Sequence, residues 1–357
     1  MVNEARLGTP EAPTFGLDTF GDLERGPDGA PVHHAVALRQ VVEEAVLADS
    51  VGLDFFGVGE HHRPDFSISA PDVLLAAIAG RTRRIQLGTS VTVLSSEEPV
   101  RVFERFATLD AVSQGRAEIT AGRGSFTESF PLFGLPLENY EVLFAEKLQL
   151  LAALLDEQPV SWEGTVRPPL DEADLYPKTE GGLAMWVGVG GTPESVVRAA
   201  SYGLPLVVAV IGGSPERFVP LVELYHRALE HYGHPTRPVS MHSPGHVAAT
   251  DEEAREQMFP HQAESFTRIG RERGWGPYTR EQFEENASPT GSIFVGSPET
   301  VAQKIAWAVR TVGLSRFQLK YAVGGLPHEL RQESIRLYGT QVVPRVRELL
   351  GVEPADF

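Results

Sequence analysis

The sequence contains no cysteine among its 357 residues. Disulfide bonds, thiolate metal sites and a cysteine nucleophile are therefore excluded. No run of about eighteen apolar residues occurs, so no transmembrane helix is predicted. The opening segment MVNEARLGTPEAPTFGLD lacks a basic region followed by an apolar core, and we expect no signal peptide. A cytoplasmic location is the resulting expectation.

Positive charge is also scarce. There are 31 Lys and Arg residues against 48 Asp and Glu, a net charge of −17. Phosphate backbones and anionic membranes bind basic surfaces, so this balance argues against nucleic-acid and membrane partners. Apolar residues make up 42% and charged residues 22%, which is a globular composition. We expect residues 1–357 to form a single domain with a large core.

Short apolar runs alternate along the chain with amphipathic segments of helical periodicity. The predicted strands begin near Thr14, Leu53, Ile85, Arg116, Ala184, Leu204, Val239 and Arg316. The predicted helices are Val36–Val51, Pro71–Arg81, Pro99–Ser113, Tyr140–Asp156, Pro193–Tyr202, Pro215–Tyr232, Pro298–Val312 and His328–Leu350. This alternation predicts an α/β fold, a TIM (β/α)₈ barrel. An open doubly wound sheet is the alternative.

Two segments do not fit the repeat, and we expect them as insertions at the carboxyl-terminal rim of the barrel. Residues 157–182 contain SWEGTVRPPL, which resembles a small hairpin. Residues 250–292 are polar and helical and follow the seventh strand. Because loops at this rim shape the active site, the second segment is a candidate lid. A surface insertion or a dimer contact is the alternative.

The carboxyl-terminal ends of barrel strands are where catalytic residues are expected. His61 and His62 follow the second strand, and neighbouring side chains of an extended segment point in opposite directions. Only one of the two can therefore face the barrel mouth, where an imidazole could act as a general base. A structural histidine is one alternative. A metal site is another, but it needs further ligands, and other strand ends carry Ser90, Gly122, Gly190 and Gly212.

Three further strand ends carry features that suit a flat, anionic ligand. Thr89, Ser90 and Val91 are small residues that let a ligand approach the backbone. Arg123 lies between two glycines and could bind a phosphate, or pair with a carboxylate instead.

After the fifth strand, glycines lead into a helix that begins at a Thr-Pro pair. Backbone N–H groups and the helix dipole would favour an anion there, helped by two hydroxyls. The residues concerned are Gly190, Gly191, Thr192 and Ser195. A structural helix cap by Thr192 is the alternative. The spacing is neither that of a Walker loop nor that of a dinucleotide fingerprint.

Several of these motifs occur together in a longer pattern. It runs from Glu60-His61-His62 through IQLGTSVTVLSSEEPVRVFERFATLDAVSQGRAEITAGRGSFTESFPLFG and Tyr140 to VGVGGTPESVVRAASYGLPL. This pattern resembles the luciferase-like monooxygenases, the family of bacterial luciferase and the long-chain alkane monooxygenase. The resemblance covers nearly the whole chain and looks closest to a bacterial subgroup that is expected to use FMN.

The resemblance implies a role for each matching residue. His61 would lie beside the flavin and assist proton transfer, and Tyr140 would be an aromatic residue near it. Residues expected at the FMN phosphate are Arg123, Gly190, Gly191, Thr192 and Ser195. Thr89, Ser90 and Val91 would form a bulge that supports the ring, with a cis peptide bond at Ser90–Val91.

The implied activity is an FMN-dependent monooxygenase that uses reduced FMN and O₂ to oxygenate a small organic substrate. A separate flavin reductase or NAD(P)H would supply the reduced FMN, and a homodimer or higher homo-oligomer is implied. Gly122 stands where bacterial luciferase has a reactive cysteine, and we do not predict light emission.

Three alternatives remain open. They are an F420-dependent dehydrogenase or reductase of the same superfamily, a non-catalytic flavin-binding protein and a metal-dependent hydrolase. Residues that could line a substrate pocket are Phe15, Asp18, Phe66 and Phe126.

Overall fold

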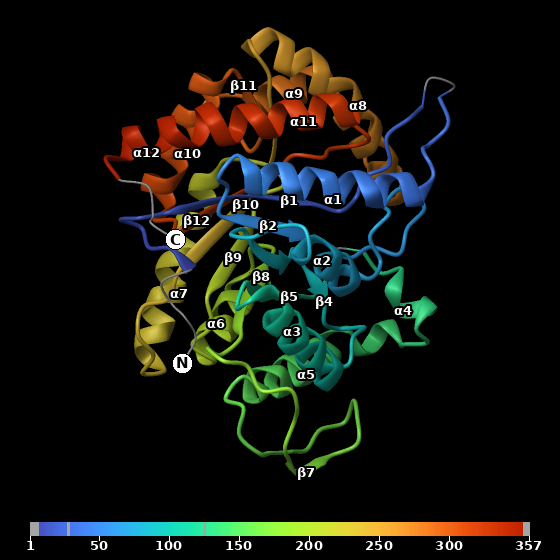
Figure 1. The fold of residues 1–357 in the computed structure, drawn as a ribbon, viewed down its shortest axis with the longest axis vertical. Coiled ribbons are helices and arrows are strands. Elements are labelled where there is room, and N and C mark those ends of the chain that lie inside the picture. Colours follow the sequence, from blue (N-terminus) through green and yellow to red (C-terminus); the bar gives the residue numbers. More distant parts are fainter. Residues whose placement is uncertain (1–6, 27–28, 125, 353–357) are drawn as a thin grey trace.

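Eight parallel strands close into a barrel in the computed structural model, which describes residues 7–26, 29–124 and 126–352 (Figure 1). The barrel strands are β1 (Thr14–Thr19), β2 (Phe55–Val58), β3 (Gln86–Thr89), β5 (Ala117–Gly122), β8 (Ala184–Val189), β9 (Leu206–Ala209), β10 (Val239–Val247) and β12 (Arg316–Lys320). The sheet closes because β10 pairs with both β9 and β12. The predicted (β/α)₈ barrel is confirmed, and each predicted strand start lies within two residues of an observed one.

Helices connect successive strands on the outside of the barrel. Those predicted from periodicity are α1 (His34–Ser50), α2 (Pro71–Ala79), α3 (Pro99–Ser113), α5 (Tyr140–Leu154), α6 (Pro193–Ser201), α7 (Val219–His231), α10 (Pro298–Val312), α11 (His328–Leu337) and α12 (Val343–Leu350). One predicted helix begins as a 3₁₀ turn at Pro215–Phe218 before α7. The last is divided by a π-helical turn at Tyr338–Val342.

Alternate residues of the strands face either the surrounding helices or the barrel interior. Leu17 and Leu319 belong to the apolar layer between strands and helices. The barrel interior is polar near the amino-terminal ends of the strands. There the guanidinium of Arg316 pairs with the carboxylate of Glu118, and both side chains are fully buried. Because β12 and β5 are not neighbours, this ion pair crosses the barrel interior.

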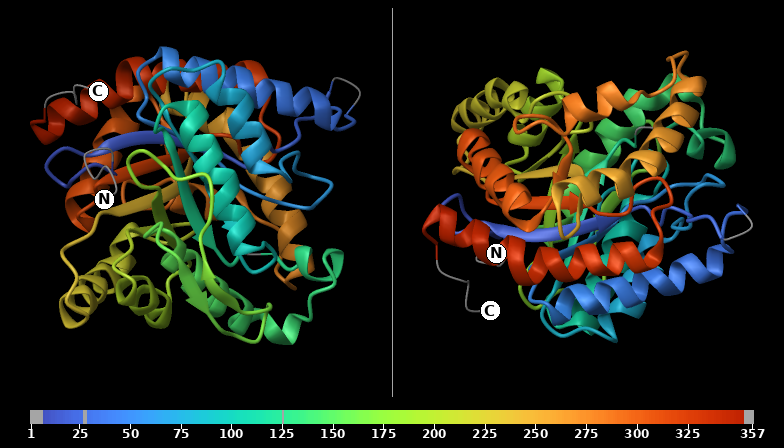
Figure 2. Two further views of the ribbon diagram at one scale, coloured as in Figure 1. Left: turned by 60° about the horizontal axis from the view of Figure 1, so that its bottom comes forward. Right: turned by 90° about the horizontal axis from the view of Figure 1, so that it is seen from above.

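Helices α1 and α11 lie side by side on the outside of the barrel (Figure 2). The buried carboxylate of Glu44 on α1 accepts hydrogen bonds from Tyr321 Oη at 2.7 Å, His328 Nδ1 at 2.8 Å and Arg331 Nε at 2.7 Å. Burial alone would raise the pKa of Glu44, but the charge of Arg331 and these hydrogen bonds hold it below its usual value. The network ties two helices that are distant in sequence.

The insertion at 157–182 contains the predicted hairpin, formed by β6 (Val160–Trp162) and β7 (Leu170–Ala173). It connects the end of α5 to the beginning of β8, so its two ends lie at the amino-terminal ends of the strands. Its tip extends back along α5, where Arg167 Nε lies 3.0 Å from Glu98 Oε1 at the start of α3. Only the tip therefore approaches the carboxyl-terminal rim.

The insertion at 250–292 begins after β10, at the carboxyl-terminal rim. It forms α8 (Asp251–Glu272) and α9 (Arg280–Asn286), and β11 (Phe294–Gly296) then pairs with β10. A small apolar cluster that includes Met258 and Phe283 joins both helices to the rim. His246 of β10 is buried there, with Nε2 2.7 Å from Gln257 Oε1 of α8, and burial lowers its pKa to about 4.

No helix in the described ranges is both long enough and apolar enough to cross a bilayer.

Candidate active site

A cavity of about 270 Å³ opens at the carboxyl-terminal ends of the barrel strands. Every barrel strand, or the loop that follows it, contributes to its wall. Among the residues that line it are Phe20, His61, Val91, Gly122, Gly188 and His242. The cavity is therefore where a (β/α)₈ barrel places its chemistry.

The floor of this cavity is made by Val91 and two glycines. A Cβ atom at Gly122 would lie 2.5 Å from Cγ2 of Val91, and one at Gly188 would lie 3.0 Å from its Cγ1. Gly122 is thus required because the valine side chain occupies the space of a side chain there. The peptide bond Ser90–Val91 is cis, as predicted. The Ser90 hydroxyl lies on the wall and donates to Gln318 Oε1 at 3.2 Å.

Thr89, in contrast, lies outside the wall of the cavity and is fully buried. Its hydroxyl donates to the carbonyl oxygen of Thr120 at 3.2 Å and accepts from the Thr92 hydroxyl at 3.0 Å. The structure therefore places Thr89 in the support of the bulge rather than on the cavity surface.

His61 lies on the cavity wall within a group of aromatic rings. Phe66 stacks on the imidazole with ring centroids 4.5 Å apart, and Phe20 and Phe126 present their edges at 4.8 and 5.1 Å. His62 points away, with Nε2 2.9 Å from Glu60 Oε1. The prediction that only one of the two histidines faces the barrel mouth is confirmed.

A carboxylate orients His61. Its Nδ1 lies 3.3 Å from Oε1 of Glu128, just before the short helix α4 (Ser129–Leu132). Burial would raise the pKa of Glu128, but its hydrogen bond with His61 and other contacts hold that pKa below its usual value. A carboxylate at Nδ1 leaves Nε2 as the ring nitrogen available to a ligand.

A second, connected hollow adjoins the cavity at the amino terminus of α6. It shares Arg123 with the cavity and is otherwise lined by Glu141, Thr192, Glu194, Ser195 and Arg198. Gly191 has a φ of +111°, a conformation that disfavours side chains, and a Cβ at Gly190 would meet nothing within 4 Å. The turn into the helix is therefore open to a ligand.

Thr192 occupies the N-cap position of α6, but its side chain makes no cap hydrogen bond within the described part of the chain. The structural cap considered from sequence is thus not formed. The Ser195 hydroxyl donates to the carbonyl oxygen of Thr192 at 2.7 Å. Both hydroxyls remain beside N–H groups at the positive end of the helix, where a phosphate is favoured.

Two guanidinium groups face this helix terminus. Arg123 and Arg198 each pair with the carboxylate of Glu141, whose side chain is 62% exposed. Sequence reasoning identified Arg123 and missed Arg198. The signal was available, because Arg198 lies three residues after Ser195 and so on the same helix face.

Tyr140 lines the cavity beside Arg123. Its hydroxyl donates to the carbonyl oxygen of Gly124 at 3.1 Å, and its ring lies 5.5 Å from the guanidinium carbon of Arg123. Burial raises the pKa of the phenol. Tyr140 thus keeps its proton at neutral pH and fixes the loop that carries Arg123.

The residues of the two hollows fit both ends of FMN, its phosphate and its ring system. Two arginines, two hydroxyls and an uncapped helix terminus are a donor set for a phosphate dianion. The glycine floor provides a flat surface for a ring system beside His61.

The four residues proposed from sequence for a substrate pocket have separate positions. Phe15 is at the amino-terminal end of β1 in the apolar layer near Arg347, so its placement in the pocket is wrong. Phe66 and Phe126 enclose His61 as described. Asp18 lies beneath His242, which sequence reasoning missed together with Phe20 and Gln318.

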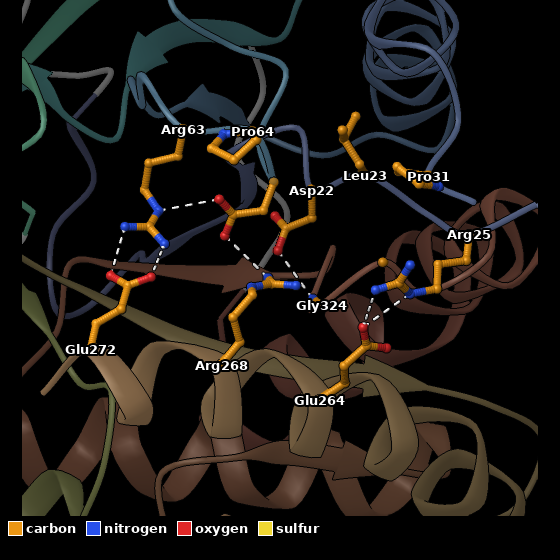
Figure 3. A pocket seen from close by; sticks show the side chains of 12 residues that line it. Asp22, Leu23, Arg25, Pro31, Arg63, Pro64, Glu264, Arg268, Glu272 and Gly324 are labelled. Carbon is orange, nitrogen blue, oxygen red and sulfur yellow. Dashed lines mark hydrogen bonds and ion pairs between the residues drawn. The ribbon is translucent and has the colours of Figure 1, made fainter. Parts of the chain in front are cut away.

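A separate cavity of about 280 Å³ lies between α8 and the loops that follow β1, β2 and β12 (Figure 3). Arg63 makes a bidentate pair with Glu272 of α8 at 2.9 and 2.6 Å. Arg268 donates to Asp65 at 3.1 Å, and Arg25 Nε donates to Glu264 at 2.9 Å. We call these three pairs the α8 seam. It holds the inserted helix to the rim beside His61.

The part of the chain that the structure describes contains no group of three His, Asp or Glu side chains suited to a metal ion.

The fold places two adjoining hollows at the carboxyl-terminal rim of a (β/α)₈ barrel, the second of them at the start of α6. Comparison with known proteins identifies the family. The model of the luciferase-like monooxygenase family matches residues 21–316, and the chain belongs to this family. It is accordingly a flavin-dependent oxidoreductase.

Individual relatives are distant in sequence. The alkanal monooxygenase alpha chain of Photobacterium leiognathi is 23% identical over 341 residues, which cover 88% of this chain and 95% of that protein. Among solved structures, monooxygenase RslO1 from Streptomyces bottropensis is 24% identical with a TM-score of 0.79, covering 93% of this chain and 99% of that one.

Two further structures with the same fold differ in cofactor. The oxygenating constituent of 3,6-diketocamphane monooxygenase from Pseudomonas putida, in complex with FMN, is 20% identical with a TM-score of 0.75, over 95% of this chain and 99% of that one. The coenzyme F420-dependent tetrahydromethanopterin reductase from Methanopyrus kandleri is 18% identical with a TM-score of 0.68, over 93% and 99%.

Proposed function

We propose that this protein is an FMN-dependent monooxygenase that oxygenates a small organic substrate with reduced FMN and O₂. The observation that carries the proposal is the pairing of two hollows. One presents a flat floor beside His61, and the other presents Arg123, Arg198 and the start of α6. The residues proposed to bind a ring system are thus in one hollow and those proposed to bind a phosphate are in the other, an arrangement that suits the two ends of FMN.

Each group of residues has a distinct task. Arg123, Arg198, Thr192 and Ser195 bind the phosphate, and Val91 with its neighbouring glycines supports the ring. When bound, reduced FMN supplies the two electrons that allow O₂ to react. One oxygen atom enters the substrate and the other leaves as water, which also receives the two hydrogens of the reduced cofactor.

His61 holds or moves a proton at Nε2, because Glu128 engages Nδ1. Phe20, Phe66 and Phe126 surround the imidazole and limit its contact with water. The α8 seam keeps the inserted helix over the neighbouring rim, where it restricts access of water to the site. A separate flavin reductase or NAD(P)H would provide the reduced cofactor.

The alternative cofactor is F420, since a structural neighbour depends on it. Its long polyglutamyl tail would need a basic groove leading away from the phosphate site. Arg123 and Arg198 are both paired with Glu141, and the α8 seam pairs its arginines with carboxylates. We therefore favour FMN.

An anaerobic titration with photoreduced FMN, run in parallel with reduced F420, tests the cofactor. Oxygen is then added and absorbance followed. Tight binding of reduced FMN and a transient, oxygen-dependent absorbance before the oxidised spectrum returns are expected. Preference for F420, or reoxidation at the rate of free FMN, contradicts the proposal.

A His61→Ala variant tests the assigned base. Turnover should fall by about 10²- to 10⁴-fold, the usual contribution of a proton-transfer residue, with FMN binding largely kept. Equal turnover in the variant contradicts the role of His61. The expected homo-oligomer remains a prediction that light scattering on the purified protein can check.

A further inference from the structure

A second imidazole faces the cavity, and it is held by a buried carboxylate. His242 on β10 lines the cavity, and its Nδ1 lies 2.7 Å from Oδ2 of Asp18 on β1. The His242 side chain is 12% exposed, whereas that of Asp18 is fully buried. Strand β12 lies between β10 and β1, so the pair spans the inner face of three adjacent strands.

The pairing determines which nitrogen of His242 is available to a ligand. An ionised carboxylate only accepts hydrogen bonds, so Nδ1 carries the proton that bridges to Asp18. In the neutral imidazole, Nε2 then keeps its lone pair, and it belongs to the ring edge away from Asp18. His242 therefore offers the cavity a proton acceptor of fixed orientation.

The two carboxylate oxygens of Asp18 have different surroundings. Its second oxygen, Oδ1, is buried and has no hydrogen-bond partner within the described part of the chain. A buried carboxylate with one oxygen unpaired is costly, and such groups call for a functional explanation. The carboxylate stabilises a positive charge on His242 once Nε2 takes up a proton.

The cavity thus contains two imidazole–carboxylate pairs. His61 with Glu128 lies towards the rim, where the Glu128 side chain is 20% exposed. In the second pair the carboxylate of Asp18 is fully buried. The ring of Phe20 contacts both, with centroid distances of 4.8 Å to His61 and 6.2 Å to His242. Phe20 therefore lies against two proton acceptors that are about equally exposed, at 9% for the His61 side chain and 12% for that of His242, but whose carboxylate partners differ in burial.

We propose that His242 is a second proton-carrying residue of the catalytic cavity and that Asp18 is its positioning residue. The proposal rests on the proposed function, in which both hydrogens of reduced FMN end in the water molecule. Nε2 of His242 accepts one proton, which forms an imidazolium beside Asp18. It returns that proton to the oxygen that leaves as water, so the residue is unchanged after each turnover.

Other titratable groups share these surroundings. Those on the wall of the cavity are Glu60, His61, Arg123 and Tyr140. Lys320 lies behind Phe20, with Nζ 4.6 Å from the ring centroid and 2.9 Å from Asp22 Oδ2. Because several groups can affect a pH profile, the test needs a signal from His242 itself.

Turnover and binding of the intact protein give the first part of the test. His242→Gln keeps a polar side chain but cannot carry a proton, and Asp18→Asn keeps the shape of the positioning residue. The exposed His231→Gln on α7 is the matched control. We expect a loss of turnover of about a hundredfold or more in His242→Gln. The dissociation constant of oxidised FMN should change less than about threefold, and the control should match wild type.

Nitrogen NMR of ¹⁵N-histidine-labelled, ligand-free protein gives the second part. His242 should show a protonated Nδ1 and a bare Nε2, and Asp18→Asn should lose this preference. The opposite tautomer in wild type overturns the proposal. So does a His242→Gln variant with more than half of wild-type turnover and an unchanged pH profile.

Failure of the two proposals can be distinguished. A wild-type protein that binds reduced FMN but consumes no oxygen overturns the proposed function, whereas the tautomer of His242 is measured without any cofactor. Circular dichroism shows whether His242→Gln is folded. If it is not, Asp18→Asn carries the turnover measurement, with an expected loss and an altered pH profile.

Discussion

Replacing Arg123 with Met should weaken FMN binding and leave riboflavin binding nearly unchanged. Arg123 is the residue that both hollows share, and its guanidinium faces the start of α6 together with Arg198. Riboflavin has the same ring system as FMN but no phosphate. A loss confined to FMN would therefore locate the phosphate at this position.

The magnitude follows from two opposing contributions. A hydrogen bond to a charged group contributes about 1.5–3 kcal/mol. Binding of the phosphate also separates Arg123 from Glu141. Because the Glu141 side chain is 62% exposed, breaking this ion pair costs only about 0–1 kcal/mol. The net loss of about 0.5–3 kcal/mol corresponds to an FMN affinity about 2- to 150-fold weaker.

Anaerobic titrations of wild type and variant with both ligands measure this effect, and Glu141→Gln supplies a control of opposite sign. Without the competing carboxylate, FMN affinity should rise up to about fivefold, the equivalent of about 1 kcal/mol. Equal losses of FMN and riboflavin affinity in Arg123→Met would refute the phosphate assignment, since they would indicate a disturbed ring site instead.

Three further predictions concern the floor, the helix network and pH. Gly122→Ala places a Cβ 2.5 Å from Val91 Cγ2. We expect urea unfolding to show a loss of about 1–3 kcal/mol in unfolding free energy, and riboflavin titration to show weaker binding of the ring system. Glu44→Gln removes the nearest carboxylate of the buried Arg331, with Glu24 Oε2 remaining at 3.7 Å, and should cost about 3–5 kcal/mol in urea unfolding; a cost below about 1 kcal/mol would contradict the network. The pKa of His246 is about 4 in the folded protein against about 6.5 when exposed, so only the unfolded chain takes up this proton as pH falls through that range. Unfolding free energy should therefore decrease by up to about 3 kcal/mol between pH 6.5 and 4, and His246→Asn should reduce that slope.

The barrel could be predicted because its signals are local. Each strand is a short apolar run, and prolines such as Pro71 and Pro193 stand at the first turn of a helix. The break at Tyr338–Val342 was missed, since a π-helical turn keeps an amphipathic pattern. The position of the 157–182 hairpin tip depends on Arg167 meeting Glu98, a contact between separate elements.

The site was predictable where one strand end carries its own signal. His61, Ser90, Val91 and Arg123 all lie on the cavity wall, because the ends of parallel strands meet at one rim. His242 lies within the run VSMHSPGHVA. The sequence pattern does not distinguish a polar residue that faces the barrel interior from one on a solvent-exposed strand face. Its partner Asp18 is 224 residues away, and only closure of the barrel brings the two together.

The two halves of α8 are held by different forces, and we therefore expect only one half to respond to ionic strength. Ala254 and Met258 in the first half are packed in an apolar cluster, whose burial does not depend on ionic strength. Glu264, Arg268 and Glu272 in the second half are held by the ion pairs of the α8 seam, which salt screens. Rising salt should therefore increase amide hydrogen exchange in the second half of the helix while the first half stays protected. We therefore expect the end of the inserted helix that is held by ion pairs to detach from the rim before the end that is held by apolar packing.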